Sequence, residues 1–117
     1  MPFVSVMTNQ KVSAKQETEI KSAVGRILKD VAGKPEEWLM VALSGGHPIF
    51  FKGARDTACA MIEIKYLGAF TADQKKKITI ELCTLMSATC GVPPEALYVA
   101  FSSFDANNWG WNNAMFG

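Results

Sequence analysis

Hydrophobic and polar positions along the chain follow one pattern twice, with the second copy 58 residues after the first. Each copy contains an apolar stripe with the spacing i, i+4, i+7, i+8, which places all four residues on one face of a helix. The stripes are Ile20, Val24, Ile27 and Leu28 in the first copy and Ile78, Leu82, Leu85 and Met86 in the second. Each copy therefore predicts a helix that buries one side.

Both predicted helices have sequence signals at their ends. A Ser/Thr-x-x-Gln capping box, which satisfies two backbone amides at a helix start, occurs at residues 13–16 and again at 71–74. A glycine suited to a left-handed helix end, followed two residues later by a proline, occurs at 33–35 and at 91–93. These signals predict two helices of about 18 residues each.

Apolar residues alternate with others on both sides of each helix, which is the period of a strand. The alternating residues before the helices are Val4 and Val6 in one copy and Ile62 and Ile64 in the other, and those after the helices are Leu39, Val41, Leu43 and Leu97, Val99, Phe101. A helix that joins two strands of one sheet favours parallel pairing and a right-handed connection. We therefore expect an α/β (α+β) fold in which two pseudo-symmetric βαβ repeats, about residues 2–43 and 60–101, form one four-stranded sheet with both helices on one face.

This arrangement leaves the other face of the sheet uncovered. The residues expected there are partly apolar and partly charged: Phe3, Ser5, Met7, Met61, Glu63 and Lys65. Such a face is too apolar for water and too polar for a closed core, so we expect the chain to form an oligomer.

Three segments lie outside the repeat. Residues 44–48 form a turn-rich loop whose single His47 is interpreted as an exposed loop residue, and residues 49–51 are compatible with a short edge strand. The tail, residues 102–117, combines aromatic side chains with small amides and is expected to be docked. Two interpretations of the tail stay open and are compatible: it covers a sheet edge or subunit interface, or it lines a binding pocket.

Composition narrows the class of protein. The 117 residues are 49% hydrophobic with a formal net charge of +1, which predicts one compact domain over residues 1–117 and no binding of nucleic acid. No apolar run approaches a membrane span of about 20 residues and no secretory signal is evident, so we expect a cytoplasmic protein, released, if at all, by a route without a signal peptide. The three cysteines lack metal-ligand spacing, so we expect no metal site and no disulfide framework.

Pro2 follows the initiator Met1 directly and opens the first predicted strand. Removal of Met1 would leave Pro2 with a free secondary amine, which can act as a base. The ordinary interpretation is that Met-Pro begins many proteins without any catalytic role. For the amine to be unprotonated at neutral pH its pKa must be lowered, which burial and a nearby cation both favour.

Several motifs follow one another over essentially the whole chain: Met1-Pro2, Gly33-Lys34-Pro35, Gly53 with a strand ending at Gly68, Val92-Pro93 before Leu97-Tyr98-Val99, and Gly110-Trp111-Asn112-Asn113 with Phe116. Their order and spacing resemble the macrophage migration inhibitory factor family of the tautomerase superfamily. The resemblance implies a homotrimer of the tautomerase fold. It also implies keto–enol tautomerase activity, of the phenylpyruvate or dopachrome type, on aromatic 2-oxo acids, without a cofactor.

The same resemblance implies roles for particular residues. Pro2 would be the general base, and Lys34 beside it would depress the pKa of the amine and hold the substrate carboxylate. The alternative for Lys34 is that it complements a helix C-terminal dipole. The pocket wall would consist of Phe3, Trp38, Leu67, Trp109, Trp111 and Phe116, with Tyr66 at the mouth and Tyr98 contributed by a neighbouring subunit.

The chain also departs from the family pattern. Ala100 occupies a position that is commonly a polar amide, and Lys65 and Tyr66 precede Leu67 where smaller residues or histidine are familiar. These changes remove one hydrogen bond to substrate and predict a bulkier, more basic pocket mouth, so the substrate preference stays open. The alternatives are a cytokine-like signalling protein that binds a receptor and has a weak or vestigial pocket, and a relative that acts on another small molecule. An acid role for a charged Pro2 is less favoured because the chain has only Arg26 and Arg55.

Overall fold

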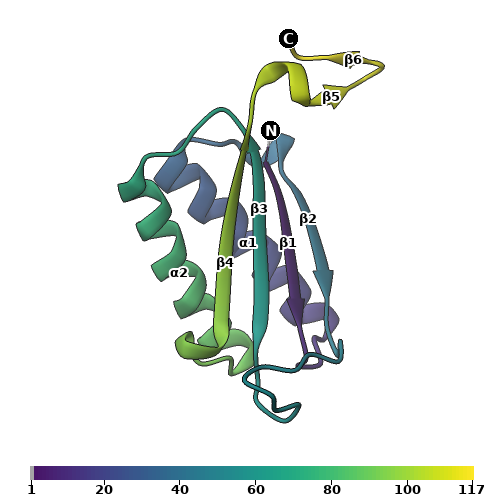
Figure 1. The fold of residues 1–117 in the computed structure, drawn as a ribbon, viewed down its shortest axis with the longest axis vertical. Coiled ribbons are helices and arrows are strands. Elements are labelled where there is room, and N and C mark those ends of the chain that lie inside the picture. The colour runs from purple at the N-terminus through teal and green to yellow at the C-terminus, as the bar shows by residue number, and fades with distance from the viewer. Residues whose placement is uncertain (1) are drawn as a thin grey trace.

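The computed structural model describes residues 2–117 and contains a four-stranded sheet with two long helices on one face (Figure 1). The elements in chain order are β1 (Pro2–Thr8), α1 (Ala14–Ala32), η1 (Glu36–Trp38), β2 (Met40–Ser44), β3 (Ala60–Leu67), α2 (Ala72–Cys90), η2 (Pro94–Ala96), β4 (Leu97–Phe104), η3 (Ala106–Asn108), β5 (Gly110–Trp111) and β6 (Ala114–Met115). None of the helices in this described range is long and apolar enough to cross a membrane.

The ends of both helices follow the predicted signals. Ser13 and Thr71 are the N-caps, and in each case the capping box is complete. Gly33 and Gly91 end the helices with φ angles of 66° and 67°, the left-handed conformation that glycine adopts without steric cost. The capping and glycine signals therefore predicted both boundaries correctly.

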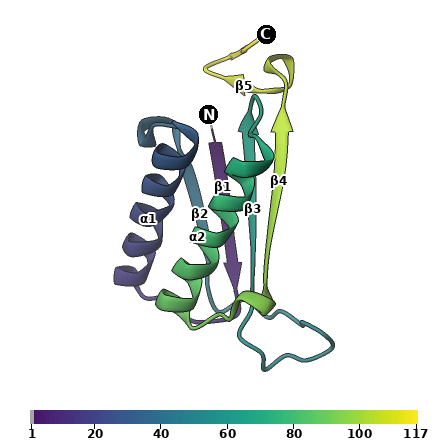
Figure 2. The same ribbon diagram turned by 90° about the vertical axis from the view of Figure 1, so that its left-hand side faces the viewer.

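The sheet has the strand order β2-β1-β3-β4. β1 pairs parallel with β2, β3 pairs parallel with β4, and the two halves meet where β1 and β3 run antiparallel, with Val4 opposite Ile64. Both helices lie on the same side of this sheet, and the β5–β6 tail extends beyond the end of β4 (Figure 2). The predicted pair of βαβ units with both helices on one face is confirmed.

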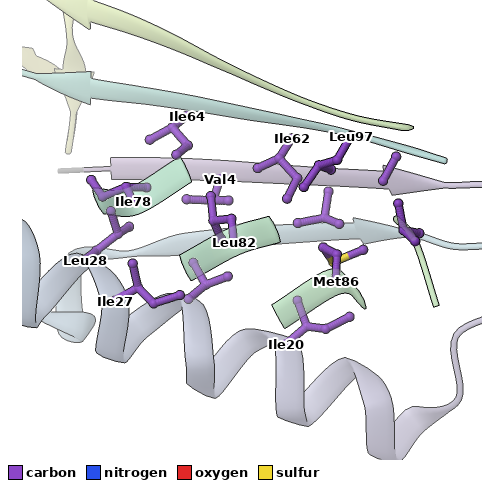
Figure 3. Close-up of a cluster of buried hydrophobic side chains, with 14 of the residues drawn as sticks. Val4, Ile20, Ile27, Leu28, Ile62, Ile64, Ile78, Leu82, Met86 and Leu97 are labelled. Carbon is purple, nitrogen blue, oxygen red and sulfur yellow. The ribbon is translucent and has the colours of Figure 1, made fainter. Parts of the chain in front are cut away.

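The core lies between the sheet and the two helices (Figure 3). Alternate strand residues and the helix stripes supply most of its fully buried side chains: Val4, Val6, Ile20, Val24, Ile27, Leu28, Ile62, Ile64, Tyr66, Ile78, Leu82 and Met86. Leu85, predicted in the second stripe, is only half-buried at the margin of the core. The predicted edge strand at residues 49–51 is wrong, because Phe51 forms only an isolated bridge to Ala54.

The face opposite the helices remains open, as expected. Phe3, Met7 and Met61 are half-buried there, whereas Glu63 and Lys65 are exposed. On the flanking strands Met40 is 66% and Tyr98 63% exposed. Within residues 2–117 no helix covers this face, which leaves large apolar side chains in contact with solvent.

Candidate functional site

The topology brings the candidate residues to one end of the sheet. β1 begins at this end, α1 returns to it, and the antiparallel arrangement of β1 and β3 makes β3 and β4 end there as well (Figure 1). The backbone amide of Gly68 donates to the Phe104 carbonyl at 3.0 Å, so the ends of β3 and β4 remain connected. The tail then continues from β4 past the same end. One end of the molecule therefore carries Pro2, Lys34 and the aromatic tail together.

Pro2 is the first residue of β1 and is buried. In the antiparallel ladder it lies opposite Tyr66, near the end of β3. A proline suits this position because the first residue of a strand need not donate to the ladder. Met1, whose removal the sequence prediction requires, lies outside the described residues.

Lys34 is placed by the end of α1. The backbone amides of Gly33 and Lys34 donate to the carbonyls of Lys29 and Leu28 at 3.0 and 3.1 Å, so the chain turns sharply out of the helix. The half-buried Lys34 side chain then reaches β3, where its Nζ donates to the Leu67 carbonyl at 3.5 Å. Leu67 follows the residue that pairs with Pro2, so the ammonium lies beside the start of β1 rather than at the last helix carbonyls.

Aromatic side chains from η1 and the tail gather at the same end. The rings of Trp38 and Trp111 meet edge to face at 5.3 Å, and Trp111 and Phe116 stack at 6.2 Å. Trp109 contacts the ring of Phe104 at 5.4 Å. The predicted aromatic residues are thus adjacent, and Trp38, Trp111 and Phe116 remain 41–51% exposed. These rings form an accessible apolar surface at the same end of the sheet as Lys34.

The backbone of the tail holds these rings in place. β5 pairs antiparallel with β6, and the amide of Phe116 donates to the Trp109 carbonyl at 3.0 Å. An open hollow is lined by residues 110–115. The tail is therefore an ordered hairpin that contacts η1 through the Trp38–Trp111 pair, while residues 110–117 are exposed. Docking of the tail on a sheet edge or subunit interface stays a prediction, and its other predicted function, lining a pocket, agrees with this placement.

Tyr66 lies elsewhere than expected. Its side chain is 1% exposed and stacks on Phe70, with ring centroids 3.8 Å apart and planes inclined by 5°. Burial raises the pKa of Tyr66, and a backbone hydrogen bond from Phe70 acts in the opposite direction. The reason is the period of the strand: Tyr66 follows Ile62 and Ile64 at steps of two, so it points toward the helices. Tyr66 is part of the core beneath the site and does not form a mouth open to ligand.

Two residues of this region were missed in the sequence. Phe70 lies in the connection before α2, where no periodicity marks its contact with Tyr66. Phe104 ends β4 and was counted only as part of the tail. The alternation of β4 could have placed Phe104 on the uncovered face, but its contact with Trp109 depends on how the tail turns.

Tyr98 is not part of this cluster within one subunit. It lies at the beginning of β4, opposite Met61, and its ring contacts Phe51 at 5.6 Å. Phe104 lies six positions further along β4, or roughly 20 Å away. Phe3 is half-buried on the open face and pairs with Met40 and Lys65. Both residues therefore belong to the open sheet surface, where a second subunit would meet them.

Comparison with known proteins gives consistent results. The family model described as "Macrophage migration inhibitory factor (MIF)" matches residues 1–117. The chain is 25% identical over 117 residues to the macrophage migration inhibitory factor homolog of Brugia malayi, and the match covers 100% of both chains. It is 27% identical over 116 residues to the macrophage migration inhibitory factor of Mus musculus, and this match covers 99% of both chains. The crystal structure of Leishmania major MIF2 superposes with a TM-score of 0.90 at 28% identity, covering 99% of this chain and 97% of the other.

Proposed function

Because this chain belongs to the macrophage migration inhibitory factor family, we propose that it is a keto–enol tautomerase that acts on aromatic 2-oxo acids such as phenylpyruvate. The observation that carries the proposal is the placement of Pro2 at the sheet end where the Lys34 ammonium and the exposed aromatic rings gather. Family membership supports an isomerase reaction, and the geometry supports this substrate class. A 2-oxo acid has a carboxylate for Lys34, and its aromatic ring matches the apolar surface of the tail.

In the proposed mechanism the Pro2 nitrogen, freed by loss of Met1, is the general base. It takes a proton from the carbon next to the keto group, and the electrons of the C–H bond move to form the enol double bond while the carbonyl oxygen gains a proton. Lys34 holds the carboxylate, and its positive charge disfavours a second positive charge on the resting amine. The proton for the oxygen comes from Tyr98 of a neighbouring subunit or from water.

The proposal includes a homotrimer. The uncovered sheet face, with Met40 and Tyr98 more than half exposed, supports association of subunits. Since Tyr98 lies at the other end of its own sheet from Pro2, only a neighbouring subunit can bring it to the site. Size-exclusion chromatography with light scattering should give three times the subunit mass at micromolar concentration, and a stable monomer would contradict this part of the proposal.

The central experiment compares three forms of the protein in a phenylpyruvate enol–keto absorbance assay. Protein without Met1 should be active, Pro2→Gly should lose most activity, and protein that retains Met1 should be inactive, because its Pro2 nitrogen is an amide without a basic lone pair. Intact mass spectrometry identifies each form beforehand. The Met1-retaining form is the sharpest control, since it keeps the Pro2 side chain and removes only the amine. Equal rates in all three forms would remove Pro2 from the mechanism.

A second candidate is a signalling protein that binds a receptor through its surface and keeps only a weak pocket. The names of the relatives from Mus musculus and Brugia malayi, macrophage migration inhibitory factor and its homolog, support it, and so does Ala100, which supplies no polar side chain to a substrate. Weak turnover of all 2-oxo acids tested, together with saturable binding to cells, would favour this candidate. Strong turnover that depends on the Pro2 amine would favour the enzyme.

A further inference from the structure

The Lys34 side chain rests on an aromatic stack. Its Nζ lies over the ring of Phe70, 5.9 Å from the centroid, and Phe70 stacks face to face on Tyr66. Phe70 is 7% and Tyr66 1% exposed, so both rings are fixed by the surrounding core. The cation therefore lies against two buried, stacked rings, those of Phe70 and Tyr66, which belong to the core adjoining the candidate site.

The partners of Lys34 leave part of its binding capacity free. An ammonium has three donors, and the Leu67 carbonyl accepts one of them over a long 3.5 Å. The ion pairs within residues 2–117 join Lys21 to Glu36, Arg26 to Glu81 and Lys77 to Asp73, and Lys34 forms none there. A half-buried cation without a carboxylate partner is suited to bind an anionic ligand.

A free lysine is a poor anchor because its flexible four-carbon side chain loses much rotamer freedom when it is fixed. A ring that attracts the cation restricts this side chain before the ligand arrives, so less entropy is lost on binding. The ring can do this only if it does not move itself. The close stacking of Tyr66 on Phe70 meets that condition.

We propose that Phe70 and Tyr66 are positioning residues that hold the Lys34 ammonium ready for the substrate carboxylate. The inference rests on the proposed function for the identity of the substrate. It explains why an aromatic side chain occupies position 66: the ring of Tyr66 supports Phe70, on which the ammonium of Lys34 rests. It also assigns a role to Phe70, which the sequence did not indicate.

The first experiment separates carboxylate binding from the rest of catalysis. Phe70→Leu removes the ring and keeps an apolar side chain, so KM for phenylpyruvate should rise about fivefold while kcat stays within about twofold. The methyl ester of phenylpyruvate has no carboxylate, and its KM should be unchanged by the same substitution. Phe70→Tyr retains the ring and should restore the original KM.

A matched control accounts for lost packing. Phe101 on β4 also packs against the core, opposite Ile64 of β3, and is not the ring over which the Lys34 ammonium lies. Phe101→Leu therefore makes the same chemical change at another place. It should lower stability and leave KM for phenylpyruvate unchanged. An equal rise of KM in Phe101→Leu, or an equal effect of Phe70→Leu on the ester, would overturn the proposal. If Phe70→Leu does not fold, Phe70→Met replaces it.

A second measurement does not depend on activity. The ring current of Phe70 should shift the NMR signals of the Lys34 ε-methylene protons upfield, and Phe70→Leu should remove that shift while Phe101→Leu preserves it. Loss of the shift supports the stack even if no 2-oxo acid is turned over, in which case the proposed function fails alone. An unshifted signal in the wild-type protein would refute the stack whatever the kinetics show.

Discussion

Two glutamines, Gln16 and Gln74, make equivalent bonds at opposite ends of the helix pair and permit a matched test of how the fold supports the site. Each accepts from the backbone amide of its own N-cap residue at 2.8 Å. Each also donates across to the last turn of the other helix: Gln16 to the Thr89 carbonyl at 2.9 Å, and Gln74 to the Val31 carbonyl at 3.4 Å. Val31 precedes Lys34 by three residues, so only Gln74 is connected to the candidate site.

The cost of substituting each glutamine by alanine follows from these bonds. A protein hydrogen bond contributes about 1 kcal/mol net, and alanine regains a few tenths of a kcal/mol through its higher helix propensity. We expect Gln16→Ala to lower the free energy of unfolding by about 1.5–2 kcal/mol, and Gln74→Ala by about 1–1.5 kcal/mol because its interhelix bond is longer. Only Gln74→Ala should also raise KM for phenylpyruvate, by about two- to tenfold, since it frees the end of α1 that carries Lys34.

Urea unfolding followed by circular dichroism measures the first effect, at one fixed protein concentration because the stability of an oligomer depends on it. The enol–keto assay at low temperature, where both variants are folded, measures the second. Gln74→Glu is a further control: its carboxylate can still accept the capping bond, but it cannot donate to Val31. An unchanged stability in both alanine variants would refute the hydrogen bonds, and equal KM values would refute the connection between Val31 and Lys34.

Two further predictions concern stability alone. Burial raises the pKa of Tyr66 above its ordinary 10.0, so the contribution of the neutral hydroxyl to stability is complete below pH 10 and is lost as pH rises through the folded-state pKa. Tyr66→Phe should therefore lose less stability than the wild-type protein between pH 9 and pH 11, as measured by urea titration. An equal loss would contradict the burial of the hydroxyl. Gly33→Ala and Gly91→Ala should each lower the free energy of unfolding by about 1–2 kcal/mol, because both positions have a positive φ. The added methyl group meets open space at both positions, so the backbone conformation alone causes this loss. Thermal unfolding measures both variants, and a stabilised variant would contradict the left-handed cap.

The parts of the fold that sequence predicted well are those set by local chemistry. Capping boxes, cap glycines and apolar stripes each act within one or two helical turns, and all of them occur where expected except Leu85, which is only half-buried. The same period of two would have placed Tyr66 in the core, had it been followed one step beyond Ile64. The contacts of Phe70 and Phe104 were not predictable in this way, because they depend on how two connections turn in space. The proposed role of Tyr98 would require a second subunit, and no pattern within the chain can position that subunit.

The internal repeat explains why the candidate catalytic residues occur in only one half of the chain. A shift of 58 residues carries Pro2 onto Ala60 and Lys34 onto Val92, so the two halves have equivalent backbones at these places. Ala60 lies inside the chain and has no free amine. Val92 is fully buried in the core, whereas its counterpart Lys34 reaches β3 with its ammonium. The second half thus shows what these positions do when they serve only the fold. The differences in the first half place a nitrogen that can become a base beside a cation with free donors, which a βαβ unit does not require for its stability.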